Sequence, residues 1–184
     1  MEGRSMAEMT RKEFVLAMIS AGDHPRLSGL DLAGLNLNTL DLARVNLSRV
    51  QLQGAHLIST HLDDATFDDA NMQGAILSGA SLNGARLARA MMAYASFSGA
   101  KLTNADLRKS SCQHAVFSNA DLTGAKLTNA SLTRANLSGA NLTGTNLTNA
   151  DLFEANLLNA NLTDADLTGA DLTRATMPDG SIHL

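Results

Sequence analysis

Residues 135–144 read Ala-Asn-Leu-Ser-Gly-Ala-Asn-Leu-Thr-Gly, which is one five-residue unit written twice. The unit continues in both directions without an insertion or a deletion. From residue 32 to residue 177 in steps of five, all thirty positions are Leu, Phe, Met or Cys. We call this position the centre of the repeat. So short and regular a period predicts a solenoid, in which each unit contacts only its neighbours.

The other four positions of the unit are also restricted. Two residues before the centre stands a small or apolar residue, almost always Ala after residue 60. The residue just before the centre is often Asp or Asn, and the residue just after it is mostly Ser or Thr. The second residue after the centre is frequently Gly, Asn or Asp. Each position therefore has its own physical role.

Neither an α-helix nor a flat strand explains a period of five. In an α-helix a five-residue step turns by about 500°, so the centres would spread over the whole surface. In a flat strand an odd period places successive centres on opposite faces. A chain that bends by about 90° every five residues gathers all centres inside. Four repeats then close one square coil of 20 residues, and centres 20 apart stack.

This geometry assigns directions to the side chains. The centre and the small residue two before it point inward, the Asp or Asn between them points outward, and the last two residues form the corner. Gly or Asn at the second corner residue suits a turn that needs a positive φ there. Several repeats have Arg, Lys or His at this position, and we predict a different turn type for them. Among them are Arg44, Arg49, Lys109, His114 and Arg134.

The unit Ala-(Asp/Asn)-Leu-(Ser/Thr)-Gly resembles the pentapeptide repeat family, and the resemblance covers about residues 27–182. It implies an all-β solenoid, a right-handed quadrilateral (four-sided) parallel β-helix. The strictly regular, alanine-rich units look like those of many cyanobacterial members. Some members of the family resemble duplex DNA in width and charge, and inhibit or protect DNA gyrase.

The chain divides into four parts on this reading. Residues 1–9 look like a disordered, tag-like N-terminus, and residues 10–26 are predicted to hold a capping helix and its connection. Residues 27–177 form about 30 repeats, or about 7.5 coils and a rod of roughly 36 Å. Residues 178–184 form a C-terminal turn and tail. The lid helix starts at a capping box, Thr10 to Glu13. Its apolar residues are Phe14, Leu16, Met18 and Ile19.

The interior is predicted from the stacking of centres. Phe97 and Phe117 should lie face to face, and Met72, Met92 and Cys112 should form a softer column. Cys112 is therefore expected to be a buried apolar residue and not a nucleophile. The predicted core includes Leu32, Leu37, Leu42, Leu47, Phe67, Met72, Met92, Phe97, Cys112, Phe117, Leu137, Leu157 and Leu172.

The outward positions offer little chemistry. His56 and His61 could bind a metal, and four aspartates could bind a cation, but solvated side chains are the favoured reading for both groups. The aspartates are Asp63, Asp64, Asp68 and Asp69. Ion pairs are predicted for Lys101 with Asp121 and for Asp106 with Lys126, which are 20 apart. No catalytic residue, cofactor or metal is expected, so the chain is not expected to be an enzyme.

Some outward positions are apolar, and they are either scattered or form a modest sticky stripe. They are Ile58, Ile76, Met91, Val116, Phe153 and Leu158. The C-terminal coil has no comparable lid, because Pro178 starts a turn with only Ile182 as a last apolar residue. A homodimer or an end-to-end contact through that coil is the hypothesis that follows.

Composition bounds the function. The formal net charge of −4 is too small to indicate a nucleic-acid binder, so nucleic acid is not expected as a partner. A mimic of DNA would need sustained negative charge, whereas residues 86–134 hold seven basic residues against Asp106 and Asp121. A single cysteine favours a reducing compartment, the cytoplasm, and no stretch is apolar enough to cross a membrane. The favoured function is a non-catalytic scaffold or protein-interaction rod with an unknown protein partner; the alternative is a DNA mimic that acts on gyrase.

Overall fold

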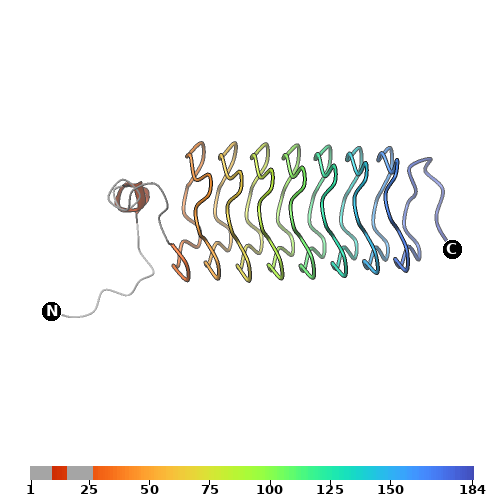
Figure 1. Cartoon of the computed structure of the whole chain (residues 1–184), viewed down its shortest axis with the longest axis horizontal. Helices are drawn as coiled ribbons and strands as arrows, with labels where there is room; N and C mark the ends of the chain where they lie inside the picture. Colours follow the sequence, from red (N-terminus) through yellow and green to blue (C-terminus); the bar gives the residue numbers. More distant parts are fainter. Residues whose placement is uncertain (1–9, 16–26) are drawn as a thin grey trace.

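The computed structural model describes residues 10–15 and 27–184. The predicted tag-like tail and most of the predicted lid helix lie outside the described residues. From residue 27 onward the chain winds into stacked coils that form one rod (Figure 1). The residue before each centre pairs in parallel with the residue 20 further on, from Asp31–Gln51 to Asn156–Thr176.

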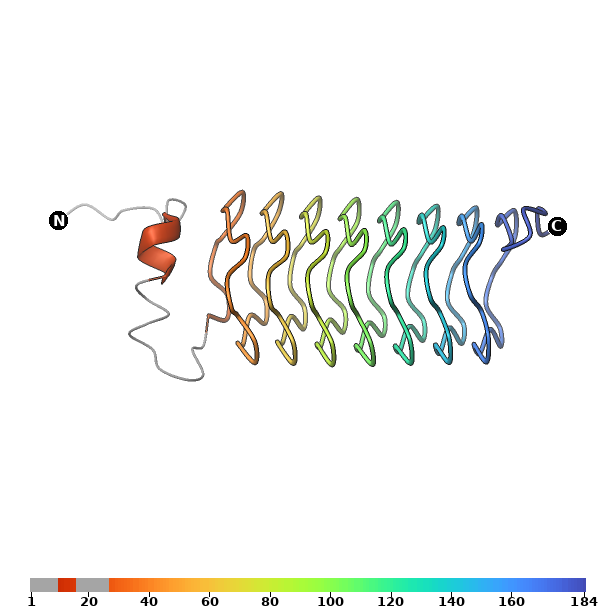
Figure 2. The ribbon, with the colours of Figure 1, turned by 90° about the horizontal axis from the view of Figure 1, so that it is seen from above.

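Five residues to a side and 20 to a coil give four sides. We number the sides 1 to 4 by their bridge residues in the first coil, which are Asp31, Asn36, Asp41 and Asn46. Seen from above, the coils stack in parallel along the whole rod (Figure 2). The same four sides therefore run from one end to the other, each carrying one residue from every coil.

A ladder of backbone hydrogen bonds joins each coil to the next. Leu102 N donates to Asp121 O at 2.7 Å, Asn104 N to Thr123 O at 2.9 Å, and Asp121 N to Ala100 O at 2.9 Å. A fourth bond closes the corner turn, from Ala105 N to Leu102 O at 3.0 Å. This pattern repeats along the rod and satisfies four of the five N–H groups in a repeat, as buried or half-buried backbone requires.

The outward Asp or Asn satisfies the fifth N–H group. Asn136 Oδ1 accepts from Ser138 N at 3.1 Å, and Asp121 Oδ1 accepts from Thr123 N at 3.1 Å. This bond reaches two residues along the chain, a local bond to which short Asp and Asn side chains are suited. Where the bridge residue is Ser81, an aspartate of the preceding coil replaces it, because Asp63 Oδ1 accepts from Asn83 N at 2.8 Å. The preference for Asp and Asn thus has its origin in the backbone.

The prediction of a second turn type for the basic corners is wrong. In every repeat from residue 29 to residue 174, the second of the two corner residues has a positive φ, whether or not it is Gly. Arg44 has φ 60°, Lys109 has φ 58° and Arg134 has φ 56°. Arg49 and His114, at 57° and 58°, behave alike. The corner N–H must reach the next coil, and this bond offsets the left-handed strain of a non-glycine residue, about 1–2 kcal/mol.

The interior is filled as the stacking of centres predicts. The rings of Phe97 and Phe117 stack with centroids 4.9 Å apart and planes 6° apart. The column of Met72, Met92 and Cys112 is fully buried. Of the predicted core residues, only Leu172 is partly exposed. They are Leu32, Leu37, Leu42, Leu47, Phe67, Met72, Met92, Phe97, Cys112, Phe117, Leu137, Leu157 and Leu172.

Polar exceptions in the alanine column are satisfied locally. Thr60 Oγ1 donates to Leu37 O at 3.0 Å, and Thr145 Oγ1 donates to Leu122 O at 2.8 Å. Both threonines are buried, so each needs such a partner. A hydroxyl therefore fits where alanine stands elsewhere, provided that a carbonyl of an adjacent coil is within reach.

A helix at residues 11–15 lies at the N-terminal end of the rod (Figure 1). Thr10 N donates to Glu13 Oε2 at 2.8 Å and Glu13 N donates to Thr10 Oγ1 at 3.3 Å, which is a capping box. Phe14 is completely buried within the hydrophobic core cluster. Arg11 donates to Asn36 Oδ1 of the first coil at 3.1 Å. The other predicted lid residues, Leu16, Met18 and Ile19, lie outside the described residues.

The C-terminal end is closed on one side only. The tail folds back so that Ile182 forms an antiparallel bridge with Thr176 on side 2. Elsewhere on the last coil the apolar residues are only partly buried. They are Leu162, Leu167, Leu172 and Met177. Within the described residues, the backbone N–H groups of Leu162, Leu167 and Leu172 donate to no other residue.

The role of the outward amide can be tested at residue 136. Asn136→Ala removes the acceptor for Ser138 N, and we expect a loss of about 1 kcal/mol in the free energy of unfolding. Asn136→Asp keeps an oxygen in the same place and should retain most of the stability. Urea unfolding followed by circular dichroism measures both variants. Equal losses in the two variants would contradict the backbone role.

Candidate interaction surface

Charged residues are confined to two of the four sides over the middle of the rod. Sides 1 and 2, with their corners, are formed there by residues 51–59, 71–79, 91–99 and 111–119, which contain no Asp, Glu, Lys or Arg. Sides 3 and 4 of the same coils hold all the formal charges. They are Asp63, Asp64, Asp68, Asp69, Arg86, Arg89, Lys101, Asp106, Arg108, Lys109, Asp121 and Lys126. Over this stretch sides 1 and 2 together form an uncharged half of the surface, which we call the uncharged side. Sides 3 and 4 together form the opposite half, which we call the charged side.

The large outward apolar residues follow the opposite rule. Ile58, Met91, Tyr94 and Leu158 are exposed, and all four lie on sides 1 and 2 or their corners. The partly exposed Ile76, Val116 and Phe153 lie there as well. The six apolar residues noted in the sequence are therefore gathered on one half of the surface. Tyr94 was not recognised as a surface residue from the sequence. Counting in steps of 20, which places it at the corner of side 1, was the signal that could have identified it.

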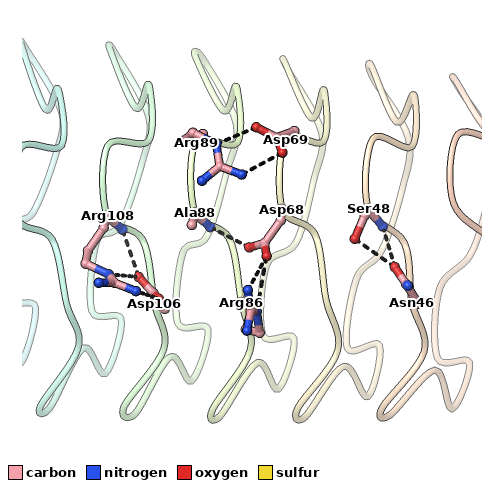
Figure 3. A network of polar contacts seen from close by, with 9 residues as sticks. All are labelled: Asn46, Ser48, Asp68, Asp69, Arg86, Ala88, Arg89, Asp106 and Arg108. Atoms are coloured by element: carbon pink, nitrogen blue, oxygen red, sulfur yellow. Dashed lines mark hydrogen bonds and ion pairs between the residues drawn. The ribbon is translucent and has the colours of Figure 1, made fainter.

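The charged side is a network of short ion pairs, drawn in Figure 3. Arg86 contacts Asp68 at 2.6 Å and Arg89 holds both carboxylate oxygens of Asp69 at 2.7 Å. A hydrogen bond from Arg89 lowers the pKa of Asp69. Such exposed pairs are worth about 0–1 kcal/mol each. Their main effect is to engage the arginines of these sides with carboxylates of the same chain.

The two ion pairs predicted from the spacing of 20 do not form. Asp106 pairs instead with Arg108 on its own coil, at 2.6 Å, and a hydrogen bond from Arg108 lowers the pKa of Asp106. Asp121 accepts from Thr123 Oγ1 at 2.6 Å. The charge of Lys126 contributes to the lowered pKa of Asp106, and the charge of Lys101 to that of Asp121, but neither lysine forms an ion pair with its carboxylate. A partner two residues along the chain wins because it also fixes the corner turn.

The side chains singled out as metal ligands have other partners. His61 lies between two carboxylates, with Nδ1 3.3 Å from Asp41 and Nε2 2.9 Å from Asp63. His56 lies on side 2, away from this group. Within the described part of the chain, no three His, Cys, Asp or Glu side chains are placed to hold one metal ion. Asp64 instead leans over the corner at Gly84.

Ser81, Asp63 and His61 are close together but in the wrong order for a nucleophile. Asp63 stands in the middle, accepting from Ser81 Oγ at 2.6 Å and contacting His61 Nε2 at 2.9 Å. Burial alone would raise the pKa of Asp63, but hydrogen bonds from Ser81, Asn83 N and His61 lower it. A serine nucleophile needs the imidazole next to its hydroxyl. This group therefore braces two coils.

Burial makes the single cysteine inert. Cys112 is fully buried, and its burial raises the pKa of the thiol to about 12, although a contact with Ser110 opposes this. The thiolate, which is the reactive form, is therefore scarce near neutral pH.

One corner column stands out between sides 1 and 2, and it passes from uncharged residues in the middle of the rod to charged residues near the C-terminal end. Its residues are Gly34, Gly54, Gly74, Tyr94, His114, Arg134, Glu154 and Arg174. The rings of Tyr94 and His114 stack with centroids 4.9 Å apart and planes 3° apart. Glu154 then binds Arg134 at 2.7 Å and Arg174 at 3.1 Å. Stacked rings and ion pairs thus tie successive coils together.

The chain belongs to the pentapeptide repeat family. The family model described as "Pentapeptide repeats (8 copies)" matches residues 26–57, 46–84, 77–108, 110–149 and 140–178, most of the chain. This confirms the predicted fold class, the right-handed quadrilateral β-helix. Members of the family are generally structural or interaction proteins, which mediate contacts with other proteins.

Solved structures similar to the chain are also pentapeptide repeat proteins. HetL, involved in heterocyst differentiation regulation in the cyanobacterium Nostoc sp. strain PCC 7120, is 28% identical over 96% of this chain and 100% of its own, with a TM-score of 0.43. A thylakoid lumen protein of Arabidopsis thaliana is 28% identical over 60% of this chain and 70% of its own, with a TM-score of 0.40.

A trypsin-treated variant of QnrB1, a plasmid-mediated fluoroquinolone resistance protein, is 20% identical over 80% of this chain and 83% of its own, with a TM-score of 0.43. The comparison with curated proteins found no match. Among the described residues, no helix is long and apolar enough to cross a membrane.

The hydrogen-bonded carboxylates predict how stability depends on pH. A hydrogen bond from Thr123 lowers the pKa of Asp121 below its ordinary 3.8, and a hydrogen bond from Thr168 does the same for Asp166. A lowered folded pKa stabilises the fold above the unfolded pKa, and this contribution disappears as the pH falls through the folded pKa. We therefore expect the thermal midpoint to drop below about pH 4. Asp121→Asn should make the drop shallower; a midpoint that is constant from pH 7 to pH 2 would contradict this account.

Proposed function

We propose that the protein is a non-catalytic protein-interaction rod whose uncharged side, formed by sides 1 and 2 of residues 51–119, is the surface that a partner protein covers. One observation carries the proposal: over the middle of the rod, residues 51–130, formal charges and large outward apolar residues occupy opposite halves of the surface. The core requires neither distribution, because outward residues do not contact the stacked centres.

The physical basis is the cost of desolvation. A charged side chain that a partner covers loses its water and needs a new partner of its own, so the centres of interfaces are depleted of charged residues. Tyr and Met are enriched there. The uncharged side offers exposed Tyr94, Met91 and Ile58, without a charge to desolvate. The backbone ladder also makes this side stiff, so little conformational entropy is lost on binding.

Two substitutions on opposite sides test the proposal. Met91→Glu places a charge on the uncharged side, and Arg108→Glu changes a charge on the charged side. Proteins captured from a native lysate by the wild type should be retained by Arg108→Glu and reduced at least about tenfold by Met91→Glu, because a buried unpaired charge is costly. Circular dichroism checks that both variants fold. Equal loss from both variants, or from neither, would contradict the assignment of the surface.

Mimicry of DNA is the second candidate. It is favoured by the C-terminal third, where residues 141–171 hold five acidic residues and no basic one. The most acidic row of bridge residues has Asp31, Asp151 and Asp171 at its ends, but Ser and Met interrupt it. In a DNA gyrase supercoiling assay we expect no inhibition at micromolar protein. Inhibition there would favour the mimic over the interaction rod.

We also propose that the protein is cytoplasmic.

Self-association through the last coil is a further part of the proposal. Unpaired N–H groups and partly exposed leucines at Leu162, Leu167 and Leu172 form an open edge, which a second copy could pair with. The edge is self-complementary, so a two-fold dimer would close it.

Light scattering against protein concentration tests this end. We expect a dimer that Leu167→Asp disrupts, because the substitution places a charge in the contact. Ile58→Asp, on the uncharged side and far from the open edge, should leave the dimer intact. A strict monomer at millimolar protein would rule out the end-to-end contact.

A further inference from the structure

The corner column between sides 1 and 2 changes character at residue 94. Gly34, Gly54 and Gly74 are exposed, and nothing lies within 4 Å of the Cβ position at any of them. The next residue in the column, Tyr94, is 67% exposed. We call these four residues the glycine step. It is an open ledge of three coils that ends at an aromatic ring.

One face of the Tyr94 ring is stacked and the other is open. The rings of Tyr94 and His114 are 3° from parallel, with centroids 4.9 Å apart, and the two residues occupy the same place in successive coils. Because parallel rings come no closer than about 3.5 Å, the ring normals lie within about 45° of the rod axis. The open face of Tyr94 is therefore turned toward the coil of Gly74, where residue 74 has no side chain to cover it.

The column has room for one more ring. Positions in successive coils are about 4.8 Å apart, which is close to the 4.9 Å between the ring centroids of Tyr94 and His114. A ring of another molecule at the level of Gly74 would meet Tyr94 at this same distance. Aromatic pairs prefer centroid distances of about 4.5–7 Å. The glycine step is thus the next place in an existing stack, and an aromatic ring fits it.

The charges around the glycine step favour a neutral ring. Residues 31–130 contain eight acidic and eight basic residues, so these coils have no net charge to attract an ion. Sides 1 and 2 contain no charged residue from 51–59 to 111–119, and side 2 with its corner contains none from 35–39 to 155–159. An ion that lost its water here would find no counter-charge.

The absence of basic residues from this stretch of sides 1 and 2 also disfavours a nucleobase, because nucleic acids are held by Lys and Arg at their phosphates. An aromatic side chain of a protein brings a ring without a charge.

We infer that the protein partner places a neutral aromatic side chain, Phe, Tyr or Trp, in the glycine step and stacks it on the open face of Tyr94. This inference rests on the proposed function, because it names the chemistry of the partner on the uncharged side. Stacked aromatic pairs contribute more than their buried area alone, and Tyr and Trp are enriched among the residues that dominate interfaces. Tyr94 is thus the anchor of the interface.

The fold supplies a matched pair of variants. Asn side chains at second corner residues lean toward the next coil: Asn104 Oδ1 lies 2.5 Å from the Cβ position of Gly124. Asn104 has φ 59°, so Asn is accepted at this corner conformation. Gly74→Asn should therefore fill the space over Tyr94. Gly99→Asn changes a corner with the same φ of 64° and the same open surroundings, on another edge of the rod.

A random peptide library displayed on phage is the probe. Peptides that bind the wild type are counter-selected on Gly74→Asn, and in a parallel selection on Gly99→Asn; circular dichroism checks that both variants fold. We expect peptides to survive only the Gly74→Asn counter-selection, enriched in Phe, Tyr and Trp over the starting library. Replacing the aromatic residue by Leu should weaken binding about two- to tenfold, because the stack is lost while an apolar side chain remains. Survivors without aromatic enrichment, or no survivors at all, would overturn the inference.

Nuclear magnetic resonance locates the contact. Tyr94 is the only tyrosine, so selective labelling of tyrosine reports on the glycine step alone. A selected peptide should shift the ring protons of Tyr94 upfield, because they would then lie over the face of a second ring. Unchanged signals would overturn the inference. A single-stranded oligonucleotide should leave them unchanged, and a shift on its addition would favour a nucleobase over a protein side chain.

Failure of the proposed function can be told apart from failure of this inference. The function fails if Met91→Glu does not release the native partner. A partner that Met91→Glu releases but Gly74→Asn does not would leave the function standing and remove the aromatic anchor.

Discussion

The hydrogen-bond ladder between coils is the interaction on which the whole structure depends. It fixes the register at 20 residues, because each bridge residue must meet its counterpart one coil further on. The register then dictates the chemistry of the repeat. The corner must turn the same way every time, so even Arg44 and Arg134 adopt a positive φ. Where the outward residue is Asp or Asn, its side chain accepts a hydrogen bond from the corner N–H group that the ladder does not use, as in Asn136 and Asp121.

The fold can be predicted almost completely from the sequence, because the five-residue period determines where each residue lies in a coil. Inward and outward positions follow from counting in fives, and stacked pairs such as Phe97 and Phe117 follow from counting in twenties. The errors arose where two local solutions compete. Asp106 could pair with Lys126 across coils or with Arg108 two residues away, and spacing alone does not rank the two. Likewise, the identity of a corner residue does not reveal that the ladder overrides its conformational preference.

The candidate surface was only half visible in the sequence. Its apolar residues were recognised one by one, but their concentration on sides 1 and 2 appears only when the chain is wrapped into coils of 20. Tyr94 was hidden among corner residues, where side chains of every kind occur. Its significance comes from its neighbours in the column, which are 20 residues away in either direction. In this fold a surface is formed by residues 20 apart in successive coils, whereas the core can be recognised from residues five apart along the chain.

The 20-residue register also constrains how such a protein can change its length. Adding one repeat keeps every leucine inside but turns all later columns by a quarter of a circle. The uncharged side of the coils before the insertion would then no longer be in line with the uncharged side of the coils after it. Only a whole coil can be duplicated or lost without breaking the two-sided pattern. A lineage that depends on this surface is therefore expected to lengthen or shorten its rod by twenties, although the core would tolerate fives.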